Sequence, residues 1–385
     1  MKTLSNQQLE QAFIEWPVYM QRALDLAGKV LSTSPNPRVG CVIVNNSQIV
    51  AEGWHVAAGL AHAEVMALEQ AKDNVRGGTA FVTLEPCSHT GKTGPCSEAL
   101  IEAGIRSVVI AGTDPDKRVL GSGVKKLEQA GLEVIHLQDF EKAARNLNLG
   151  YFQRQEHGRP FVRLKLAMSL DGRTALANGI SKWISSSAAR ADVQRLRAGS
   201  SAIITGINTV LVDDPSLNVR IEELDLSDEE LEENRISLAE QPLRVILDTQ
   251  LRTPGTARIL DAPGQVKIYT AESTADAKDF AENVEIVHVG TDENGVDLKS
   301  MLESLASEYA CNDVLIEAGS AISGSLLDKE LVDELVVYIA PKILGSDAKP
   351  LFELTGLTSL AESKHFTVVE VTKVGDDIKA ILAKV

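Results

Sequence analysis

Two successive series of alternating strand and helix patterns constrain the fold of this chain more than any other feature. In residues 17–148, short apolar runs of strand length alternate with segments whose apolar residues recur at helical spacing. After the polar stretch QRQEHGRP (153–160) a second alternation begins, and its last strands follow one another directly. Such alternation is typical of α/β domains built on a largely parallel sheet. The consecutive strands at the end predict a sheet that becomes mixed at its edge.

The pattern places each expected element by residue number. The first series contains a helix near 17–31, a hairpin, and a helix that starts with Pro95 at its first position and stops at Gly104. Its expected strands are 39–44, 48–54, 79–84, 106–112 and 132–137, and its last helix covers about 139–148. The expected strands of the second series are 161–167, 201–206, 243–248, 265–270, 284–289, 313–319, 333–342, 366–374 and 378–384.

The length of 385 residues exceeds what one ordinary core accommodates, so two domains are expected. We place the boundary between about 150 and 160 and predict domains over 1–157 and 158–385. No run approaches ~18 consecutive apolar residues, so no membrane span is predicted. The start MKTLSNQQLEQAF lacks the basic and apolar segments of a secretory signal, which makes the cytoplasm the expected location.

The segment EPCSHTGKTGPC (85–96) places Cys87 and Cys96 in one glycine-rich loop, although the chain has only 4 cysteines. A disulfide, a metal site or coincidence would each explain the pair. A cytoplasmic location disfavours a disulfide, which leaves metal ligation as the favoured explanation. With His62 the two cysteines form the three-ligand His/Cys set of catalytic zinc, which leaves a fourth position for water. A purely structural zinc site would need another ligand, and His89 is the only candidate nearby.

Glu64 stands two residues after His62, in the sequence HAE. In nucleobase deaminases an H-x-E motif and a later P-C-x-x-C motif share one zinc site, where the glutamate moves a proton and does not bind the metal. Both cysteines are expected at strand-to-helix junctions, where a helix N-terminus favours the thiolate. Here eight residues separate the cysteines instead of two, and the inserted SHTGKTGP carries a histidine and a lysine suited to a substrate phosphate.

The formal net charge of −16 argues against a polynucleotide partner, because such binders neutralise phosphates with Lys and Arg. A small phosphorylated substrate needs only a few local cations and stays compatible with this charge. Much of the acidity lies in IEELDLSDEELEENR (221–235), within the acidic stretch 221–240. We expect a solvated surface insertion with a short helix there.

Five motifs together resemble the deaminase half of the bifunctional deaminase–reductase family of riboflavin biosynthesis. They are PNPRVGCVIV (35–44), GWH (53–55), HAE (62–64), EPCSHTGKTGPC (85–96) and DPDKRVLGSG (114–123). The resemblance implies a cytidine-deaminase-like α/β/α domain that uses Zn²⁺. It also implies that Asn36 hydrogen-bonds the pyrimidine, while His55, His89 and Lys92 line its ring and phosphate. The family hydrolyses the 2-amino group of 2,5-diamino-6-(5-phosphoribosylamino)pyrimidin-4(3H)-one.

The second half contains no G-x-G-x-x-G, so a Rossmann dinucleotide site is not indicated. GSAISGS (319–325) instead forms a glycine-flanked turn after an expected strand, which could offer N–H groups to a pyrophosphate. With LKLAMSLDGRTA (164–175), GISKWISS (179–186), residues 196–220 and YIAPKILG (338–345), this turn resembles the reductase half of the same family. That resemblance implies a dihydrofolate-reductase-like α/β fold, NADPH as cofactor, and pairing of subunits into a homo-oligomer through the reductase domain.

The resemblance assigns roles position by position. The implied NADPH contacts are Ala167, Trp183, Thr209, Asp213, Gly319, Ser320, Ala321, Ile322, Ser323, Gly324 and Ser325. The implied substrate contacts are Ser181, Arg197, Leu217, Arg220 and Glu317, with the arginines suited to a phosphate. Lys165 and Glu317 are candidates for proton transfer near the sugar, although Lys165 could equally be an ordinary strand lysine.

The sequence therefore predicts a two-domain enzyme with consecutive activities. The first is zinc-dependent hydrolytic deamination, and the second is reduction of the ribosyl group of 5-amino-6-(5-phosphoribosylamino)uracil to ribityl by NADPH. A polynucleotide deaminase with an appended binding domain is one alternative, and it predicts a basic groove. A zinc-stabilised binding protein that has lost activity is another, but a structural site has no use for Glu64.

Overall fold

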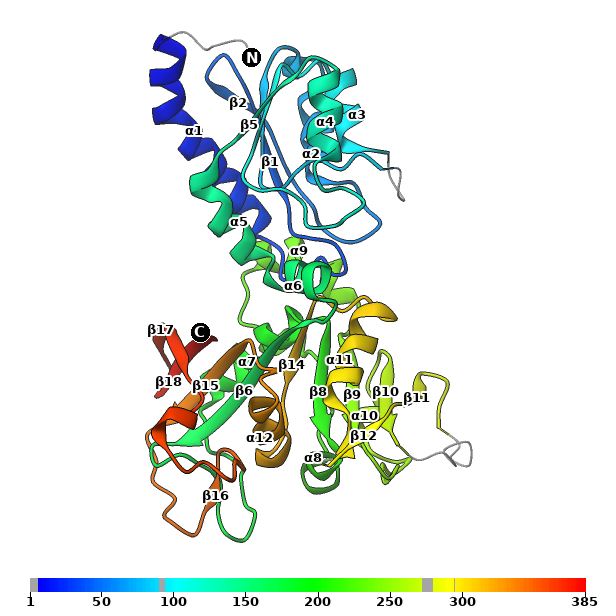
Figure 1. Ribbon diagram of the computed structural model, residues 1–385, viewed down its shortest axis with the longest axis vertical. Coiled ribbons are helices and arrows are strands. Elements are labelled where there is room, and N and C mark those ends of the chain that lie inside the picture. Colours follow the sequence, from blue (N-terminus) through cyan, green and yellow to red (C-terminus); the bar gives the residue numbers. More distant parts are fainter. Residues whose placement is uncertain (1–5, 90–93, 272–279, 294) are drawn as a thin grey trace. The chain divides into compact units, whose positions relative to one another are not determined.

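The computed structural model describes residues 6–89, 94–271, 280–293 and 295–385, and it divides into two compact units (Figure 1). Unit 1 comprises Met1–His157 and Ser227–Ser237, and unit 2 comprises Gly158–Leu226 and Leu238–Val385. The chain thus contributes a short excursion to unit 1 from within its second half, which the expectation of two contiguous domains did not include. Among the described residues, no helix has the length and apolar character that crossing a membrane requires.

Unit 1 is built on a five-stranded sheet with the order β2-β1-β3-β4-β5. Strand β1 is antiparallel to both of its neighbours, and β3, β4 and β5 are parallel. The strands are β1 (Gly40–Asn45), β2 (Gln48–Trp54), β3 (Thr79–Val82), β4 (Ser107–Ile110) and β5 (Glu133–His136). The helices are α1 (Asn6–Ala27), α2 (Ala63–Ala71), α3 (Cys96–Glu102), α4 (Ser122–Gln129), α5 (Glu141–Leu147), α6 (Leu149–His157) and α9 (Asp228–Glu233).

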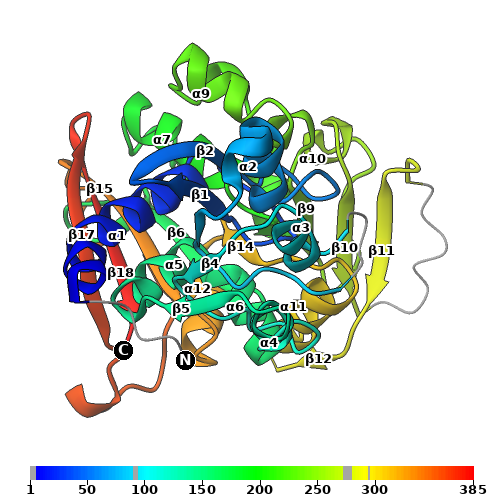
Figure 2. The ribbon, with the colours of Figure 1, turned by 90° about the horizontal axis from the view of Figure 1, so that it is seen from above.

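Helices cover both faces of this sheet (Figures 1 and 2). Side chains on β1 alternate between the faces: Cys41 and Ile43 pack in a core with α2, α3 and α4, whereas Val42 and Val44 pack in a second core with α1 and α5. Both faces of the strand are buried, which is why VGCVIV is a continuous apolar run. The predicted α/β/α arrangement is confirmed.

Unit 2 is built on a nine-stranded sheet with the order β11-β10-β9-β8-β14-β6-β15-β18-β17. In this order the strands from β11 as far as β15 are all parallel to one another. Strands β18 and β17 are added in antiparallel orientation, so the predicted mixed edge is confirmed. Its strands are β6 (Phe161–Ser169), β8 (Ala202–Gly206), β9 (Leu243–Leu247), β10 (Val266–Thr270), β11 (Val284–His288), β14 (Asp313–Ile316), β15 (Glu334–Ala340), β17 (Phe366–Val374) and β18 (Asp377–Lys384). Two small two-stranded sheets pair β12 (Thr291–Asp292) with β13 (Gly295–Val296) and β16 (Lys349–Pro350) with β7 (Arg173–Ala175).

Helices again pack on both faces of the large sheet. The main core joins α11 (Leu298–Ser307) and α12 (Ser320–Asp328) to one face. Separate cores hold α8 (Ile207–Asp213) with α10 (Arg258–Asp261), and α7 (Ser187–Ala198) with β15. Strand β14 enters the sheet between β8 and β6 after four other strands have been added on the side of β8.

Three sequence expectations need correction. Pro95 is the N-cap of α3 and does not occupy its first helical position. The polar stretch 153–160 is helical as far as His157, where α6 ends, and the chain turns at Gly158 with a φ of 69°. The acidic segment 221–235 does contain a short helix, α9, but it is not simply solvated, because Leu224 and Asn234 are 0% and 2% exposed.

Candidate functional sites

The His62, Cys87 and Cys96 side chains converge in unit 1. Their ligand atoms all lie within 4.8 Å of one another. His62 Nδ1 is 3.6 Å from Cys87 Sγ and 3.3 Å from Cys96 Sγ. Cys87 follows β3, Cys96 opens α3, and His62 directly precedes α2, so two helix N-termini and one strand end meet here.

This donor set fits a zinc ion. Zn–S bonds of about 2.3 Å and Zn–N bonds of about 2.0 Å in a tetrahedron separate the ligand atoms by about 3.5 Å, close to the distances to His62. Neither cysteine is disulfide-bonded. A hydrogen bond with Cys96 and another with His62 lower the pKa of Cys87 to about 4, against the opposing effect of burial. These contacts favour the thiolate form of Cys87, which is the form that binds zinc.

Glu64 lies beside these groups in the first turn of α2 and is 3% exposed. Burial raises the pKa of Glu64 to about 7, and the charge of Cys87 adds to this rise. A carboxyl group with a pKa near neutrality can both accept and return a proton. Its environment therefore suits the proton-transfer role predicted for it.

The structure also brings His55 and Asn36 together. His55 Nδ1 is 3.1 Å from the Ala61 carbonyl oxygen, and His55 Nε2 is 3.0 Å from Asn36 Nδ2. Because a carbonyl only accepts, Nδ1 carries the hydrogen and Nε2 accepts from the Asn36 amide. Burial lowers the pKa of His55 to about 4, so the ring is neutral and this pattern is stable near pH 7. The His55 ring centroid lies 5.2 Å from that of His62, which places the pair beside the proposed metal ligands.

The two remaining predicted residues of this site belong to the loop between the cysteines. His89 is exposed. Lys92 lies outside the described residues. Their predicted contact with a substrate phosphate stays a prediction.

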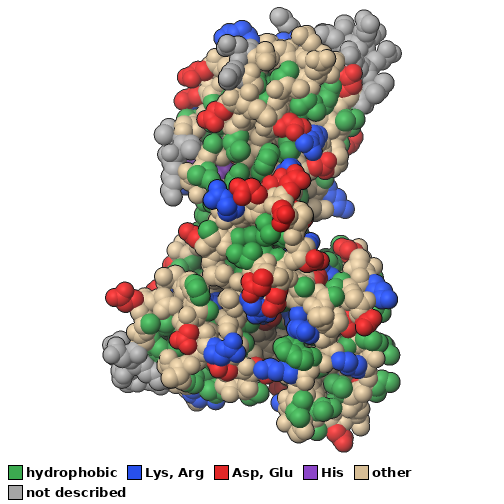
Figure 3. Space-filling view, turned by 180° about the vertical axis from the view of Figure 1, so that it is seen from behind, with side chains coloured by type: hydrophobic (Ala, Val, Ile, Leu, Met, Phe, Trp, Pro, Cys, Tyr) green, Lys and Arg blue, Asp and Glu red, His purple; other side chains and the backbone are tan. Residues whose placement is uncertain are grey.

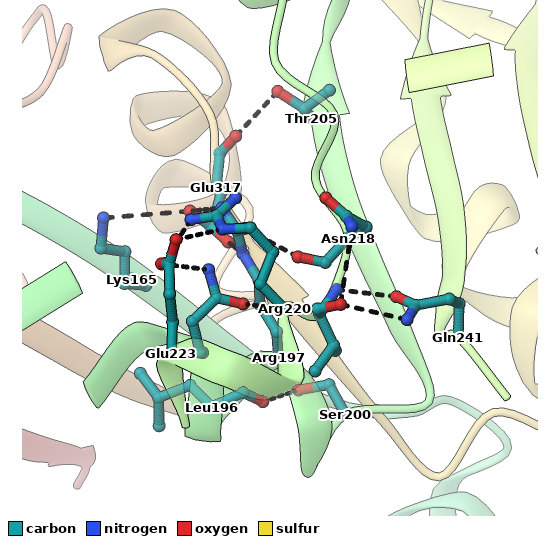
Figure 4. Close-up of polar contacts among 12 residues, drawn as sticks. Lys165, Leu196, Arg197, Ser200, Thr205, Asn218, Arg220, Glu223, Gln241 and Glu317 are labelled. Atoms are coloured by element: carbon teal, nitrogen blue, oxygen red, sulfur yellow. Dashed lines mark hydrogen bonds and ion pairs between the residues drawn. The ribbon is translucent and has the colours of Figure 1, made fainter. Parts of the chain in front are cut away.

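In unit 2 an ion cluster of partly buried side chains forms around Glu317, which directly follows β14 (Figure 4). Arg197 from α7 donates from Nε to Glu317 Oε1 at 2.6 Å and from Nη2 to Oε2 at 3.1 Å. Lys165 Nζ on β6 lies 3.9 Å from Glu317 Oε2. Burial alone would raise the pKa of Glu317, but Arg197 and Lys165 hold it below its ordinary value. Burial lowers the pKa of Lys165, and the charge of Glu317 opposes that shift.

This cluster lies near the carboxyl ends of β8 and β14 and beside the middle of β6, where Lys165 lies. Open α/β sheets bind ligands at such ends where the strand order reverses, and the late entry of β14 creates that point here. Thr205 near the end of β8 donates to the Glu317 carbonyl at 2.8 Å, which joins two of the strand ends. Predicted cofactor residues share this edge: Ala167 lies near the end of β6, and Thr209 and Asp213 lie on α8, which follows β8 directly.

The predicted residues 319–325 do not form one uniformly accessible cradle. Gly319 is the N-cap of α12 and is exposed, as is Ala321, while Ser320, Ile322 and Ser325 are half-buried. Ser323 and Gly324 are buried, and a Cβ on Gly324 would approach the Glu353 carbonyl oxygen to 2.1 Å. Only the first part of the segment can therefore offer backbone N–H groups to a ligand.

The other predicted residues of unit 2 have varied surroundings. Arg220 is paired with Glu223, with Nε 2.6 Å from Oε1. Leu217 is buried, and Ser181 is half-buried in the loop after β7. Trp183 is 64% exposed, with the Arg190 guanidinium 4.3 Å from its ring centroid. The Lys182 ammonium donates to the Asp213 carbonyl at 3.3 Å, so this loop reaches the end of α8.

The surface bears on the polynucleotide alternative. On the face shown in Figure 3, Lys and Arg are interspersed with Asp and Glu, and the described residues form no continuous basic band there. Such a surface does not provide the line of cations that a polynucleotide requires.

Comparisons with known proteins agree for both units. Residues 16–112 match the family model of the cytidine and deoxycytidylate deaminase zinc-binding region, and residues 160–380 match that of the RibD C-terminal domain. The chain is 47% identical over 367 residues to the riboflavin biosynthesis protein RibD of Haemophilus influenzae, covering 94% of this chain and 95% of the relative. It is 45% identical over 361 residues to RibD of Escherichia coli K12, covering 94% and 97%.

Solved structures give the same result. A structure of Acinetobacter baumannii RibD is similar with a TM-score of 0.86 and 43% identity, covering 96% of this chain and 98% of that one. A diaminohydroxyphosphoribosylaminopyrimidine deaminase/5-amino-6-(5-phosphoribosylamino)uracil reductase from Thermotoga maritima is similar with a TM-score of 0.83 and 33% identity, covering 96% and 99%.

Glu85 is a site residue that the sequence reasoning missed. Its side chain is 3% exposed, and its carboxylate accepts from the backbone N–H groups of Gly121, Gly123 and Val124 at 2.9–3.1 Å and of Asp114 at 3.4 Å. It thus ties the start of α4 to the turn that carries Cys87. The only available signal was an acidic residue directly after a buried strand.

We expect Glu85→Gln to weaken zinc binding about 10-fold, because the amide group would turn a donor towards backbone donors and shift the Cys87 turn. Competition with a chromophoric chelator measures the affinity. Glu98→Gln is the matched control, since Glu98 is exposed and pairs with Lys126 on the outside of the same region. Equal zinc affinities in the two variants would contradict the prediction.

Proposed function

Because the chain belongs to the RibD family, the bifunctional deaminase–reductases of riboflavin biosynthesis, we propose that each of its two units carries one of the two activities. Unit 1, which combines residues 1–157 with 227–237, would deaminate 2,5-diamino-6-(5-phosphoribosylamino)pyrimidin-4(3H)-one. Unit 2 would reduce the product. The convergence of His62, Cys87 and Cys96 beside the buried carboxyl of Glu64 is the observation that carries the proposal.

In the proposed deaminase site His62, Cys87 and Cys96 would hold zinc, which would supply a Lewis acid for activating water. Glu64 takes a proton from the attacking water and delivers it to the leaving amino group, a role that suits its raised pKa. Asn36 hydrogen-bonds the pyrimidine, and neutral His55 fixes the orientation of the Asn36 amide. His89 and Lys92 would contact the ring and the phosphate.

The proposed reductase site would hold NADPH, which would supply the hydride for reduction at C1′ of the opened ribosylamine, and the protein would align the two. Ala167, Thr209 and Asp213 lie along the strand edge where the cofactor would bind, and the exposed start of 319–325 would face its phosphates. Lys165 lies beside Glu317, and this pair would hold the proton needed near the sugar. Trp183 would complete the cofactor site, while Ser181, Arg197, Leu217 and Arg220 would complete the substrate site.

A coupled assay tests the proposal. The zinc-loaded protein receives the diaminopyrimidine ribosyl phosphate and NADPH, and ammonia and NADPH are followed in one sample. We expect ammonia release first and NADPH oxidation after it. Ammonia alone would restrict the proposal to unit 1, and neither signal would favour the zinc-stabilised binding protein.

Glu64→Gln is expected to lower the rate of ammonia release about 10²- to 10⁴-fold, because the amide cannot shuttle a proton. Zinc content and NADPH oxidation with the deaminated substrate should stay at wild-type values. Metal analysis and the two separate rate assays check these outcomes. Ammonia release at the wild-type rate would refute the proton-transfer role of Glu64.

Lys165→Met is expected to lower the rate of NADPH oxidation about 10²-fold, because the cation beside Glu317 is lost. Lys379→Met is the matched control: both ammonium groups lie 5.9 Å from the Tyr338 ring centroid, but Lys379 pairs with Asp192. The assay starts from the deaminated substrate, and ammonia release from the diaminopyrimidine should not change. Equal rates for the two variants would identify Lys165 as an ordinary strand lysine.

The same family membership supports a homo-oligomer that pairs through the reductase unit. Strand β17 is one of the two edge strands of the nine-stranded sheet, and its Val368, Val369 and Val371 are 59%, 62% and 60% exposed. An exposed apolar edge strand is a surface on which a second copy can pair.

Val371→Lys is expected to halve the mass measured by light scattering after size exclusion, because a lysine on an edge strand opposes pairing. Val18→Lys is the control, since Val18 on α1 is a comparably exposed valine at 63%. A wild-type mass equal to that of one chain would contradict the proposed dimer.

A further inference from the structure

The segment from Lys29 to Arg38 links α1 to β1 and carries Asn36. At its end, Asn148 forms a paired contact with the backbone of Arg38: Asn148 Oδ1 accepts from the Arg38 N–H at 2.7 Å, and Asn148 Nδ2 donates to the Arg38 carbonyl at 2.9 Å. Thr33 also holds the turn, donating from Oγ1 to the Asn36 carbonyl at 3.0 Å. The position of Asn36 is therefore set by backbone contacts on both sides of it.

A second asparagine makes the equivalent contact at the start of the segment. Asn234 Oδ1 accepts from the Leu31 N–H at 2.6 Å, and Asn234 Nδ2 donates to the Lys29 carbonyl at 3.0 Å. Asn234 is 2% exposed and belongs to the excursion 227–237 that the second half of the chain contributes to unit 1. Its side chain thus supplies the two backbone hydrogen bonds that a neighbouring strand would otherwise provide.

Neighbouring contacts fix the position of the Asn234 side chain. It follows α9 directly, and its Nδ2 also donates to the Glu230 carbonyl at 2.9 Å. A capping box between Ser227 and Glu230 fixes the start of that helix. Glu233 pairs with Lys29, whose ammonium lies 4.7 Å from the Trp54 ring centroid. The acidic helix is therefore attached to the same short segment by its charge as well as by its asparagine.

We propose that Asn234 is a positioning residue for the deaminase site, which the acidic insertion completes. This inference rests on the proposed function, because it assigns Asn36 to the substrate. Without Asn234, the Lys29 carbonyl and the Leu31 N–H lose their partners, and the segment is free to relax at one end. The Asn36 amide would then leave the orientation that His55 gives it, and substrate binding would weaken while the metal ligands stay in place.

The test compares Asn234→Ala with Glu232→Ala in the full-length, zinc-loaded protein. Glu232 is the matched control, because it is on the same helix and its exposed side chain forms an ion pair with Arg235. We expect Asn234→Ala to lower kcat/KM for ammonia release about 5- to 30-fold, mainly through a higher KM. Zinc content and NADPH oxidation with the deaminated substrate should not change.

Amide hydrogen exchange gives a readout that needs no activity. Exchange over residues 29–38 should become faster in Asn234→Ala and stay unchanged in Glu232→Ala. Asn234→Asp is the second variant, in case the alanine variant does not fold: it keeps an acceptor for the Leu31 N–H but lacks the donor to the Lys29 carbonyl. We expect intermediate values of KM and of exchange for it.

Two results would overturn the inference. In the first, Asn234→Ala and Glu232→Ala have equal KM values and equal exchange over 29–38. In the second, Asn234→Ala loses zinc, ammonia release and NADPH oxidation in the same proportion, as a general folding defect would produce. If the wild-type protein releases no ammonia, the proposed function fails, whereas exchange still reports separately whether Asn234 holds the segment.

Discussion

The burial of carboxylates next to the strand ends is the constraint on which both sites depend. Removing a charge from water is costly unless hydrogen bonds or an opposite charge replace the lost hydration. Glu85 receives backbone N–H groups at the start of α4, and Glu317 receives Arg197 and Lys165. Glu64 is compensated less fully, so its pKa rises to about 7. Of these three glutamates, Glu64 has the least compensation, and its raised pKa suits it to accept and return a proton.

The convergence of His62, Cys87 and Cys96 could be predicted because the chemistry of a metal site is expressed in residue types at short spacings. His62 and Glu64 are two residues apart, and Cys87 and Cys96 each follow a proline. Only Cys96 opens a helix; Cys87 lies in the loop after β3, so the expectation of a strand-to-helix junction at Cys87 is wrong. The strands could be predicted for a related reason, since runs buried on both faces must be continuously apolar. The order of the strands could not, because the insertion of β14 between β8 and β6 depends on contacts distant in sequence.

Predictions from local composition were wrong at two segments whose structure is determined by tertiary contacts. The stretch QRQEHGRP is polar enough to suggest a linker, yet α6 runs to His157 with one apolar side packed: Tyr151 and Phe152 are buried. In GSAISGS the glycines suggested an open phosphate-binding turn. At position 324, however, a glycine is required because the Glu353 backbone leaves no room for a side chain. A glycine in a sequence indicates that a side chain is excluded, and it does not indicate whether a ligand or the protein itself excludes it.

The excursion 227–237 shows how a charge run can hide a structural contact. Its many acidic residues make the average polarity of the segment high, which predicts exposure to solvent. That average conceals the single buried residue, the neutral Asn234. The asparagine is effective because one amide offers both a donor and an acceptor, which is what an unpaired stretch of backbone lacks. The side-chain amide of Asn148 makes the same pair of hydrogen bonds with the backbone of Arg38. Since the two contacts bracket the segment that carries Asn36, a deaminase unit that ended at residue 157 would keep one of them and lack the other.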